Sequence, residues 1–438
     1  MTVTEISARA KAASLKLALL STQDKNQALE KMAQALESNE SRILSANQKD
    51  LEYARKENIP GPLIARLALD SAKVKIMAQG IRSVSQLADP VGCEKSVMEL
   101  DKDLILHHVT CPIGVIGAIF ESRPDAVPQI SSLCLKSGNA VILKGGTEAQ
   151  NTNKVIVSLL TTAIGQVDGV PETAIQMIET RAEVAEMLDQ DRYINLIVPR
   201  GSNAFVRYIQ ENTKIPVLGH SEGICHAYID QGANIEMAVR VVLDSKLQYP
   251  AACNAMENLL IHQDIAAKVV PLLVEKFKEQ KVELVGCEKI CQLAPQINRA
   301  DESEWDTEYN DLKLAVKIVV DIGEAIEFIN LHGSGHTDTI LTEDPQRAEM
   351  FLNEVDSSSV MWNASTRFAD GFRYGLGAEI GISTNKTHAR GPVGLEGLVI
   401  YKYKLIGKGQ IAGDYSGDGA RKFTHQPIVP GKDRPAPA

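Results

Sequence analysis

Hydrophobic residues in the first part of the chain recur at helical spacing. Four of them stand at i, i+3, i+4 and i+7, namely Leu29, Met32, Ala33 and Leu36, behind a Ser-Thr-Gln-Asp start at residues 21–24. Apolar positions within residues 43–51 extend the same helical layer. Residues 97–108 alternate as a strand instead, between loops marked by glycine and proline. We therefore expect a helical scaffold followed by a strand.

From residue 111 onward, short apolar runs alternate with helical patterns. Strands are predicted at residues 113–119, 140–144 and 195–199, and helices at residues 124–138, 155–164 and 204–209. Pro124 and Gly138 stand where the first of these helices would begin and end. Two further short strands are predicted at residues 215–223 and 224–230. This alternation predicts a parallel βαβ sheet.

The second half of the chain repeats the alternation. A helical pattern ends at residues 249–250, and the later elements are strands at residues 259–261, 311–320, 337–341 and 357–362 with helices at 323–329 and 344–352. A late strand at residues 398–406 is expected to pair with the strand at 97–108 or with another subunit. The tail from residue 426 is rich in proline and is expected to be flexible. The fold class is therefore α/β with two such units.

Length and charge restrict the class of protein. The 438 residues are too many for one ordinary core, and the net charge of −10 argues against a nucleic-acid partner and requires local cations to hold an anionic substrate. No apolar run is long enough to span a membrane, and residues 1–14 lack a signal-peptide pattern. The seven cysteines are odd in number and scattered, which fits free thiols in a reducing compartment. We expect a cytoplasmic protein.

One thiol, Cys253, lies in a Pro/Ala turn between a helical pattern and a strand. A thiol that meets backbone N–H groups at such a junction can be a catalytic nucleophile, because the thiolate attacks acyl carbon. The alternative is a small buried core cysteine. A rival nucleophile and base, Cys225 and His226, are neighbours on a predicted strand and point to opposite faces, so they do not readily share a proton.

Nucleotide binding has a weaker signal. The chain has no G-x-G-x-x-G sequence, since Gly114 and Gly117 lie inside the predicted strand. A parallel sheet still binds nucleotides at its carboxyl edge, where Lys144 would point toward ribose or phosphate oxygens; a solvated surface lysine is the alternative. The turn containing Ser202 precedes a predicted helix and offers N–H donors to an anion.

Two other segments carry candidate chemistry. The long loop at residues 363–384 is rich in glycine and arginine, which suits a grip on phosphate or carboxylate, although solvated arginines are the plainer alternative. Cys287 and Cys291 are spaced i and i+4 as metal ligands can be, but no histidine lies near them in sequence. We interpret them as structural thiols and expect no metal.

Five segments together resemble one enzyme family. They read Phe-Glu-Ser-Arg-Pro at residues 120–124, Ile-Leu-Lys-Gly-Gly at 142–146, Tyr-Pro-Ala-Ala-Cys-Asn-Ala at 249–255, Asn-Ala-Ser-Thr-Arg-Phe-Ala-Asp-Gly at 363–371 and His-Ala-Arg-Gly-Pro-Val-Gly-Leu at 388–395. With them the chain resembles the gamma-glutamyl phosphate reductases, also called glutamate-5-semialdehyde dehydrogenases, a branch of the aldehyde dehydrogenase superfamily. The likeness covers nearly the whole chain.

The resemblance implies a domain organisation. It is an aldehyde-dehydrogenase-like α/β fold with two Rossmann-like domains and a small β oligomerisation segment. The cofactor-binding domain would comprise residues 1–96 and 111–230, the catalytic domain 231–386, and the oligomerisation strands 97–110 and 395–425, before a flexible tail at 426–438.

The resemblance also implies an activity and its residues. The reaction is NADPH-dependent reduction of L-glutamyl 5-phosphate to L-glutamate 5-semialdehyde with release of phosphate, in proline biosynthesis, through a thioester on Cys253. Substrate-binding candidates are Arg123, Arg367, Arg373 and Asn254, and cofactor-binding candidates are Lys144, Gly145, Ser202 and Glu308. Glu308 enters because Thr-Glu-Tyr at residues 307–309 resembles the superfamily's Glu-x-Phe segment, whose glutamate holds the nicotinamide ribose.

One departure from the wider superfamily bears on the reaction. Hydrolytic aldehyde dehydrogenases carry a Glu-Leu-Gly-Gly segment whose glutamate activates water, whereas residues 217–220 here read Val-Leu-Gly-His. Phosphate would then be the natural partner of the thioester, unless Glu222 replaces the missing base. A hydrolytic aldehyde dehydrogenase and a noncatalytic nucleotide-binding subunit stay open as alternatives. Candidate partners are further copies of the chain and a glutamate 5-kinase.

Overall fold

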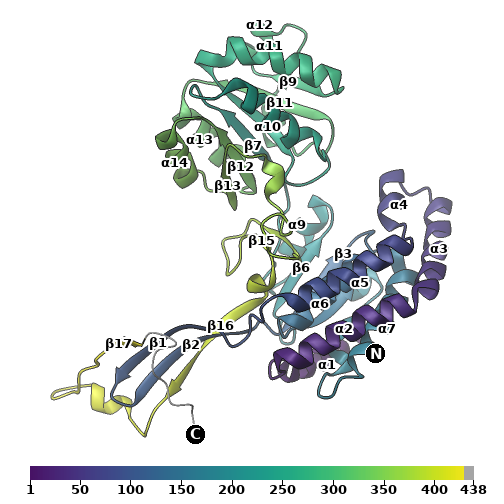
Figure 1. Ribbon diagram of the computed structural model, residues 1–438, viewed down its shortest axis with the longest axis vertical. Coiled ribbons are helices and arrows are strands. Elements are labelled where there is room, and N and C mark those ends of the chain that lie inside the picture. The colour runs from purple at the N-terminus through teal and green to yellow at the C-terminus, as the bar shows by residue number, and fades with distance from the viewer. Residues whose placement is uncertain (429–438) are drawn as a thin grey trace. The chain divides into compact units, whose positions relative to one another are not determined.

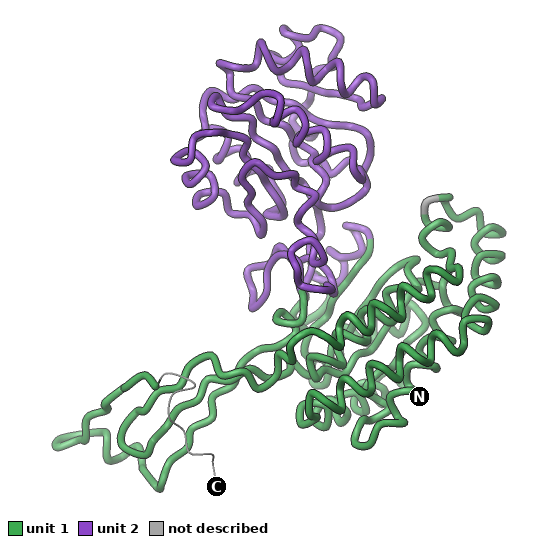
Figure 2. The backbone as a smooth tube through the Cα atoms, viewed as in Figure 1, with its two compact units in different colours: residues 1–201, 211–217, 394–438 green, residues 202–210, 218–393 purple. Residues whose placement is uncertain are grey.

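The computed structural model describes residues 1–428, except for the side chain of Pro62, and divides into two compact units. Unit 1 contains residues 1–201, 211–217 and those described from 394 onward, and unit 2 contains residues 202–210 and 218–393, as Figure 2 shows by colour. Among the described residues, no helix is both long enough and apolar enough to cross a membrane.

Unit 1 begins with helices, as predicted. They are α1 (Val3–Leu17), α2 (Thr22–Ser38), α3 (Glu40–Lys56), α4 (Gly61–Leu67) and α5 (Ser71–Gln86). The side chain of Ser21 accepts a hydrogen bond from the backbone N–H of Asp24, and the Asp24 carboxylate accepts one from the backbone N–H of Ser21. This reciprocal pair fixes the start of α2. The four apolar residues predicted for its inner face are fully buried. Burial of that stripe packs α2 against α5 and the sheet-covering helix α7 (Gln150–Ile164).

A four-stranded parallel sheet follows, in the order β5-β4-β3-β6. Its strands are β3 (Val115–Phe120), β4 (Ala140–Lys144), β5 (Ile175–Met177) and β6 (Leu196–Arg200), and its helices include α6 (Ala126–Lys136) and α8 (Arg181–Leu188) (Figure 1). The predicted βαβ arrangement is confirmed. The strand order reverses between β3 and β6, so the carboxyl ends of these two strands form the topological switch point where such sheets bind ligands.

Two strand predictions in this region need correction. Residues 215–223 form no strand; they contribute only a single bridge between Val217 and Ile197. The strand predicted at residues 97–108 is a hairpin of β1 (Glu94–Asp101) and β2 (Leu104–Pro112). The chain reverses at Asp103, whose φ of 61° is a turn conformation that aspartate tolerates, and continuous alternation on both sides hid the turn.

This hairpin belongs to a second sheet of unit 1, in the order β16-β2-β1-β17. The late strand β16 (Val399–Ile406) pairs antiparallel with β2, from Val399 opposite Pro112 to Ile406 opposite Ile105, so the pairing predicted within the chain is confirmed. β17 (Gln426–Ile428) pairs with β1. The flexible tail predicted from residue 426 is therefore wrong for these three residues, because backbone hydrogen bonds tie them to β1; residues 429–438 lie outside the described residues.

Unit 2 is built on a seven-stranded, wholly parallel sheet in the order β10-β9-β11-β8-β7-β12-β13. The strands are β7 (Cys225–Ile229), β8 (Met256–His262), β9 (Glu283–Gly286), β10 (Asn298–Arg299), β11 (Lys313–Val319), β12 (Thr337–Leu341) and β13 (Ser359–Trp362). The helices are α9 (Asn203–Glu211), α10 (Ile235–Leu247), α11 (Gln263–Glu279), α12 (Glu288–Leu293), α13 (Ile322–His332) and α14 (Pro345–Glu354). The second predicted α/β unit is confirmed.

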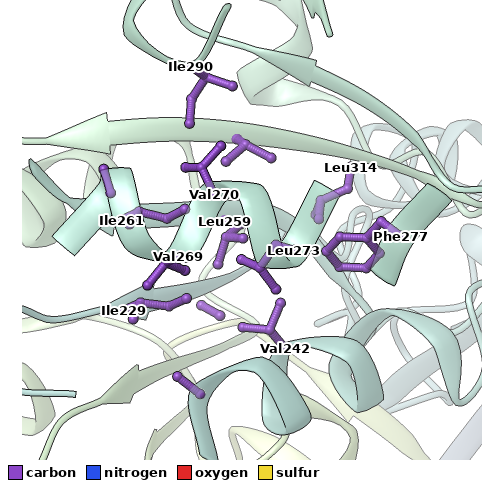
Figure 3. Close-up of a cluster of buried hydrophobic side chains, with 14 of the residues drawn as sticks. Ile229, Val242, Leu259, Ile261, Val269, Val270, Leu273, Phe277, Ile290 and Leu314 are labelled. Atoms are coloured by element: carbon purple, nitrogen blue, oxygen red, sulfur yellow. The ribbon is translucent and has the colours of Figure 1, made fainter. Parts of the chain in front are cut away.

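Two apolar clusters cover the two faces of this sheet. Ala227 and Ile229 of β7 pack with α10, α11 and α12, whereas Tyr228 between them packs with α13 and α14. Figure 3 shows the first cluster, with Val269, Val270, Leu273 and Phe277 of α11 gathered against Leu259 and Ile261 of β8. No helix was predicted at α11, because Pro271 stands inside it and argues against a continuous helix.

The boundary predicted between the two domains at residues 230 and 231 is wrong. β7 lies between β8 and β12, so residues 218–230 belong with the thiol-bearing unit and not with the first sheet. Residues 202–210, which include all of α9 except Glu211, group with that unit as well. The sequence could not show this, because the strand that precedes α10 reads like a continuation of the first alternating series.

Candidate active site

Three neighbouring strands of unit 2 bring the candidate thiol and its neighbours together at their amino ends. Cys253 lies in the turn before β8, Cys225 opens β7, and His336 directly precedes β12. Because β7 pairs with both β8 and β12 in parallel, these three ends meet at one edge of the sheet. The predicted junction around Cys253 is therefore present, and it contains residues far apart in sequence.

The turn that carries Cys253 is held by its own backbone. The N–H of Ala252 donates to the carbonyl of Tyr249 at 3.2 Å, and that of Ala255 donates to Ala252 at 2.8 Å. The N–H groups of Cys253 and Asn254 donate to no acceptor among the described residues. Two such donors beside a thiol can stabilise an oxyanion that forms on a carbon bonded to that sulfur.

Gly223 allows a second loop to pass directly against the backbone of Cys253. A Cβ at Gly223 would lie 2.1 Å from the carbonyl oxygen of Cys253 and 2.7 Å from its Cα. The same position would lie 2.7 Å from Oε1 of Glu308, whose Oε2 accepts from the side chain of Asn203 at 2.7 Å. Glu308, a predicted cofactor residue, thus lies close to Cys253.

Two histidines beside the thiol were not predicted as site residues. One ligand atom each of His220, His336 and Cys253 lie within 4.8 Å of one another. His220 was noted only as the last residue of the segment 217–220 that matches the Glu-Leu-Gly-Gly of hydrolytic relatives, in which Val217 stands at the glutamate's position, and His336 gave no signal. Their proximity depends on the strand order of the sheet, which spacing in the sequence does not reveal.

The loop at residues 363–384 brings two arginines to the site. The side chain of Arg367, in the 3-10 turn η4 (Thr366–Phe368), is largely buried and donates from Nε to Gln248 at 2.9 Å. Burial and the neighbouring Arg373 lower its pKa, while the charge of Cys253 acts in the opposite direction. Arg373 donates to the carbonyl of Arg367 at 2.6 Å. The two predicted substrate-binding arginines of this loop therefore lie together near the thiol.

Asn254 joins the thiol turn to this arginine loop. Its Nδ2 donates to the carbonyl of Ala369 at 2.9 Å, and its Oδ1 is buried without a hydrogen-bond partner among the described residues. The observed contact is one that positions the turn. Binding of substrate by this residue stays a prediction.

A buried ion pair lies behind the turn. Lys246 of α10 and Glu257 of β8 are fully buried, with Nζ 2.5 Å from Oε2. Burial raises the pKa of Glu257 to about 7, against the lowering effect of Lys246. Because α10 and β8 flank the turn on its two sides, this pair fixes where the turn begins and ends.

The cofactor candidates of unit 1 lie at the carboxyl end of β4. Lys144 is largely buried, and burial lowers its pKa although Glu148 acts against this. A Cβ at Gly145 would lie 2.1 Å from Nδ2 of Asn153, whose Oδ1 is buried without a hydrogen-bond partner among the described residues. Lys144 is therefore not the solvated surface lysine of the alternative interpretation.

The first backbone N–H groups of α7, the helix after β4, are bound by a side chain of α3. Asp50 of α3 accepts from the backbone N–H groups of Asn151 and Thr152 at 3.1 and 2.8 Å, and from both side chains. A carboxylate of the protein thus occupies these N–H groups at the start of α7, where the helix dipole favours negative charge.

The remaining candidates are more exposed. Arg123 lies in the loop after β3, with Nη2 3.5 Å from Asp125. Ser202 is exposed just before α9, and its carbonyl accepts from Phe205 and Val206. Arg123 belongs to unit 1, whereas Arg367 and Arg373 belong to unit 2.

The rival sites predicted from sequence are also resolved. His226 lies with Nδ1 2.9 Å from Asp338, while the sulfur of Cys225 donates to the carbonyl of Cys253 at 3.3 Å, so the two neighbours face different partners as predicted. Burial raises the pKa of Cys225 well above its ordinary value. All seven cysteines lie among the described residues and carry free thiols.

Known proteins share this fold and sequence. The aldehyde dehydrogenase family model matches residues 1–313. A gamma-glutamyl phosphate reductase of Acetivibrio thermocellus is 55% identical over 425 residues, which cover 97% of this chain and 98% of that protein. The crystal structure of the gamma-glutamyl phosphate reductase of Thermotoga maritima matches with a TM-score of 0.92 and 39% identity, covering 94% of this chain and 100% of that one.

A more distant structure shares the fold alone. An engineered glycolyl-CoA reductase with bound NADP⁺ matches with a TM-score of 0.63 and 15% identity, covering 92% of this chain and 96% of that one. The aldehyde-dehydrogenase-like fold expected from the sequence is confirmed. On the full-length identity and the family match, the chain belongs to the gamma-glutamyl phosphate reductases within the aldehyde dehydrogenase family.

Proposed function

We propose that this chain reduces L-glutamyl 5-phosphate to L-glutamate 5-semialdehyde with NADPH and releases phosphate, as a step of proline biosynthesis. The observation that carries the proposal is the half-buried thiol of Cys253 beside two backbone N–H groups without acceptors in the described structure and next to the buried Arg367. Relatives named for this activity match the chain over nearly its whole length.

The first half-reaction exchanges an acyl phosphate for a thioester. The sulfur of Cys253 attacks the acyl carbon, the carbon–oxygen bond to phosphate breaks, and phosphate leaves with the bonding electrons. Oxyanion charge develops in this step and is met by the N–H groups of Cys253 and Asn254. Arg367, Arg373 and Arg123 are the cations proposed to hold the phosphate and the substrate carboxylate, since arginine binds both groups in a bidentate manner.

The second half-reaction returns the thiolate. When bound, the nicotinamide cofactor supplies a hydride to the thioester carbon. The same two N–H groups would stabilise the resulting oxyanion, whose collapse breaks the carbon–sulfur bond and releases the aldehyde. The residues proposed to hold the cofactor are Lys144, Gly145, Ser202 and Glu308. The buried ammonium of Lys144 suits ribose or phosphate oxygens, and the unsatisfied Oδ1 of Asn153 beside Gly145 suits a donor of the cofactor.

A hydrolytic aldehyde dehydrogenase is the second candidate, and the contacts around residue 220 argue against it. Nδ1 of His220 lies 2.8 Å from the carbonyl of Ile382, and Glu222 is held in an ion pair with Arg207. Neither residue supplies the free carboxylate base that hydrolysis of the thioester needs.

The proposal extends to assembly and location. β16 is an edge strand of its sheet and exposes the large apolar side chains of Ile400, Tyr401, Tyr403, Leu405 and Ile406. An exposed apolar edge favours pairing with another copy, so we propose a homo-oligomer built on this strand. We also propose that the chain acts in the cytoplasm and associates with a glutamate 5-kinase.

The proposal is tested by running the reaction in reverse. Purified protein is given glutamate 5-semialdehyde with NADP⁺ or NAD⁺, with and without inorganic phosphate, for the parent, Cys253→Ala and the control Cys291→Ser. We expect cofactor reduction that requires phosphate, prefers NADP⁺, is absent in Cys253→Ala and is retained in the control.

The other results assign other functions. Turnover without phosphate would make the protein a hydrolytic dehydrogenase. Cofactor binding without any turnover in the parent would make it a noncatalytic subunit. Activity that survives in Cys253→Ala would remove this thiol as the nucleophile.

A further inference from the structure

Cys253 lies among groups that bind metal ions. One ligand atom each of Cys253, His220 and His336 lie within 4.8 Å of one another, and all three residues belong to unit 2. The thiol is half-buried, His220 is half-buried and His336 is fully buried. Nothing in the proposed reductase chemistry needs two imidazoles beside the nucleophile.

In both histidine rings Nδ1 has a polar partner, which leaves Nε2 to bind an ion. Nδ1 of His220 lies 2.8 Å from the carbonyl oxygen of Ile382, which only accepts, so in the neutral ring that binds a metal Nδ1 carries the hydrogen and Nε2 offers its lone pair. Nδ1 of His336 lies 2.8 Å from Oγ1 of Thr337 and 3.7 Å from Sγ of Cys225. Metal-binding histidines almost always donate their other ring N–H to a carboxylate, a backbone carbonyl or water, and the carbonyl of Ile382 is such an acceptor for His220.

His336 gives the second independent indication of a ligand. The side chain of His336 is fully buried, and its Nε2 has no hydrogen-bond partner among the described residues. A buried polar nitrogen without a partner is costly and calls for an explanation. The ring also packs edge-on against that of His220, with centroids 4.8 Å apart, so the two rings hold each other in place.

The donor set selects the ion. One thiolate and two neutral imidazoles are ligands that Zn²⁺ prefers, whereas Mg²⁺ and Ca²⁺ take oxygen. Zinc–nitrogen and zinc–sulfur bonds place tetrahedral ligand atoms about 3.5 Å apart, so small side-chain rotations would close the observed spacing around an ion. Three protein ligands leave a fourth position for water.

We propose that Cys253, His220 and His336 bind Zn²⁺ and that the bound ion reversibly blocks Cys253 as a nucleophile. Binding replaces the thiol proton with the metal, so one proton is released and the sulfur lone pair is committed to zinc. The metal site rests on the geometry alone. Its inhibitory consequence rests on the proposed function.

Another pair of thiols offers the matched control. Cys287 accepts from the N–H of Ile318 at 3.4 Å, and Cys291 donates to the carbonyl of Gly286 at 3.6 Å. Both belong to the region around α12, and among the described residues neither lies in a group of potential metal ligands. A Cys287→Ser/Cys291→Ser variant therefore removes two thiols without touching the proposed site.

The test is a zinc titration of the full chain after treatment with a chelator, in competition with a chromophoric zinc indicator. We expect one ion per chain in the parent. Loss of a direct ligand in His220→Gln or His336→Gln should weaken binding at least about a hundredfold, since loss of a supporting contact alone costs 10- to 100-fold. The control should bind as the parent does.

Two further readings locate the ion at the thiol. Zn²⁺ should protect Cys253 from alkylation, as followed by peptide mass spectrometry, and a chelator should restore both labelling and reductase activity. Co²⁺ in place of Zn²⁺ should give a thiolate charge-transfer absorption that Cys253→Ser lacks.

Several outcomes would overturn the proposal. These are unchanged affinity in both histidine variants, binding that disappears in the Cys287→Ser/Cys291→Ser control, and alkylation of Cys253 that Zn²⁺ does not slow. Because His336 is buried, circular dichroism is used to check that His336→Gln folds. If it does not fold, the zinc affinity of His220→Gln, at a half-exposed position, decides the test. Zinc binding that follows these variants in a chain without reductase activity would support the site and count against the proposed function alone.

Discussion

At the scale of single residues, the site depends on a close approach that only glycine permits. Gly223 lies against the backbone of Cys253 and the carboxylate of Glu308 at once. The contacting atoms of Cys253 are backbone atoms, which a side-chain rotation cannot move away. The position of the nucleophile is thus set by a residue that has no chemistry of its own.

We predict that Gly223→Ala lowers kcat/KM about a hundredfold, because displacement of a reacting group by about 1 Å can cost that much. The substitution displaces Cys253 and Glu308 together, so both substrate turnover and cofactor affinity should fall. Steady-state kinetics and cofactor titration measure the two effects. Gly80→Ala is the control, since a Cβ at Gly80 meets nothing within 4 Å. Equal activities in the two variants would contradict the assigned contact.

The sequence singled out Cys253 as the candidate nucleophile but did not reveal its surroundings. Cys253 was recognisable because a turn, a helix end and a strand start coincide around it. His220 and His336 were not, because they come to the thiol only through the pairing of β7 with β8 and β12. Asn254 could be named, but its contact with Ala369 follows from the path of the arginine loop.

At the scale of elements, one buried carboxylate joins the end of β7 to α14. Asp230 accepts from Arg347 at 2.8 Å or less, and also from Thr342 and from the N–H of Gly232. Burial alone would raise the pKa of Asp230, but these donors outweigh burial and hold the pKa below its ordinary value. The cluster therefore stabilises the charged form.

We predict that Arg347→Met lowers the free energy of unfolding by about 3 kcal/mol, the lower end of the range for removing one partner of a buried ion pair. Asp230 stays fully buried and keeps its other donors, which limits the loss. Urea unfolding at neutral pH measures it. Lys386→Met is the control, because it removes only an exposed partner of Asp356. A loss no larger than that of the control would contradict the role given to Asp230.

The same cluster predicts a pH dependence. Because the pKa of Asp230 is lowered on folding, its contribution is complete above the unfolded value of about 3.9 and is lost as the pH falls through the folded value. Acid titration of the unfolding free energy should therefore show a shallower loss of stability in Arg347→Met than in the parent. A steeper loss of stability with falling pH in Arg347→Met than in the parent would contradict a lowered pKa of Asp230.

Elements were predictable where one pattern ran without interruption. β4 and β12 were placed at their observed bounds, and most of the other helices and strands that were predicted lie within a few residues of theirs, whereas β5, β9 and β10 were not predicted. The β1 and β2 hairpin was read as one strand because its turn at Lys102 and Asp103 keeps the alternation going. α11 was missed because Pro271 masked it, although apolar packing against β8 outweighs the cost of proline.

At the scale of the whole molecule, the order of strands in space decides which unit a segment joins. β7 was assigned to the first domain by its place in the sequence, but its hydrogen bonds belong to the second sheet. The two α/β units and a separate small β segment were nevertheless predicted. The candidate residues are divided between the two units, with Lys144, proposed for the cofactor, in unit 1 and Cys253, the proposed nucleophile, in unit 2.

We predict that the double substitution Tyr403→Lys/Leu405→Lys on β16 dissociates an oligomer of the parent into monomers. Both side chains are exposed and lie two residues apart on one face, where charges would oppose pairing of the edge. Size-exclusion chromatography with light scattering measures the mass. Lys402→Gln/Lys404→Gln on the other face is the control. A parent that is monomeric, or a variant that stays assembled, would contradict the proposed edge.

The central claim is that an acyl group is carried on Cys253 itself. The most direct measurement is mass spectrometry of protein quenched after incubation with glutamate 5-semialdehyde and NADP⁺ in the absence of phosphate. We predict a glutamyl adduct on the peptide containing Cys253, which disappears when phosphate is added and never forms in Cys253→Ala. Turnover without any adduct, or an adduct on another residue such as Cys225, would contradict the account.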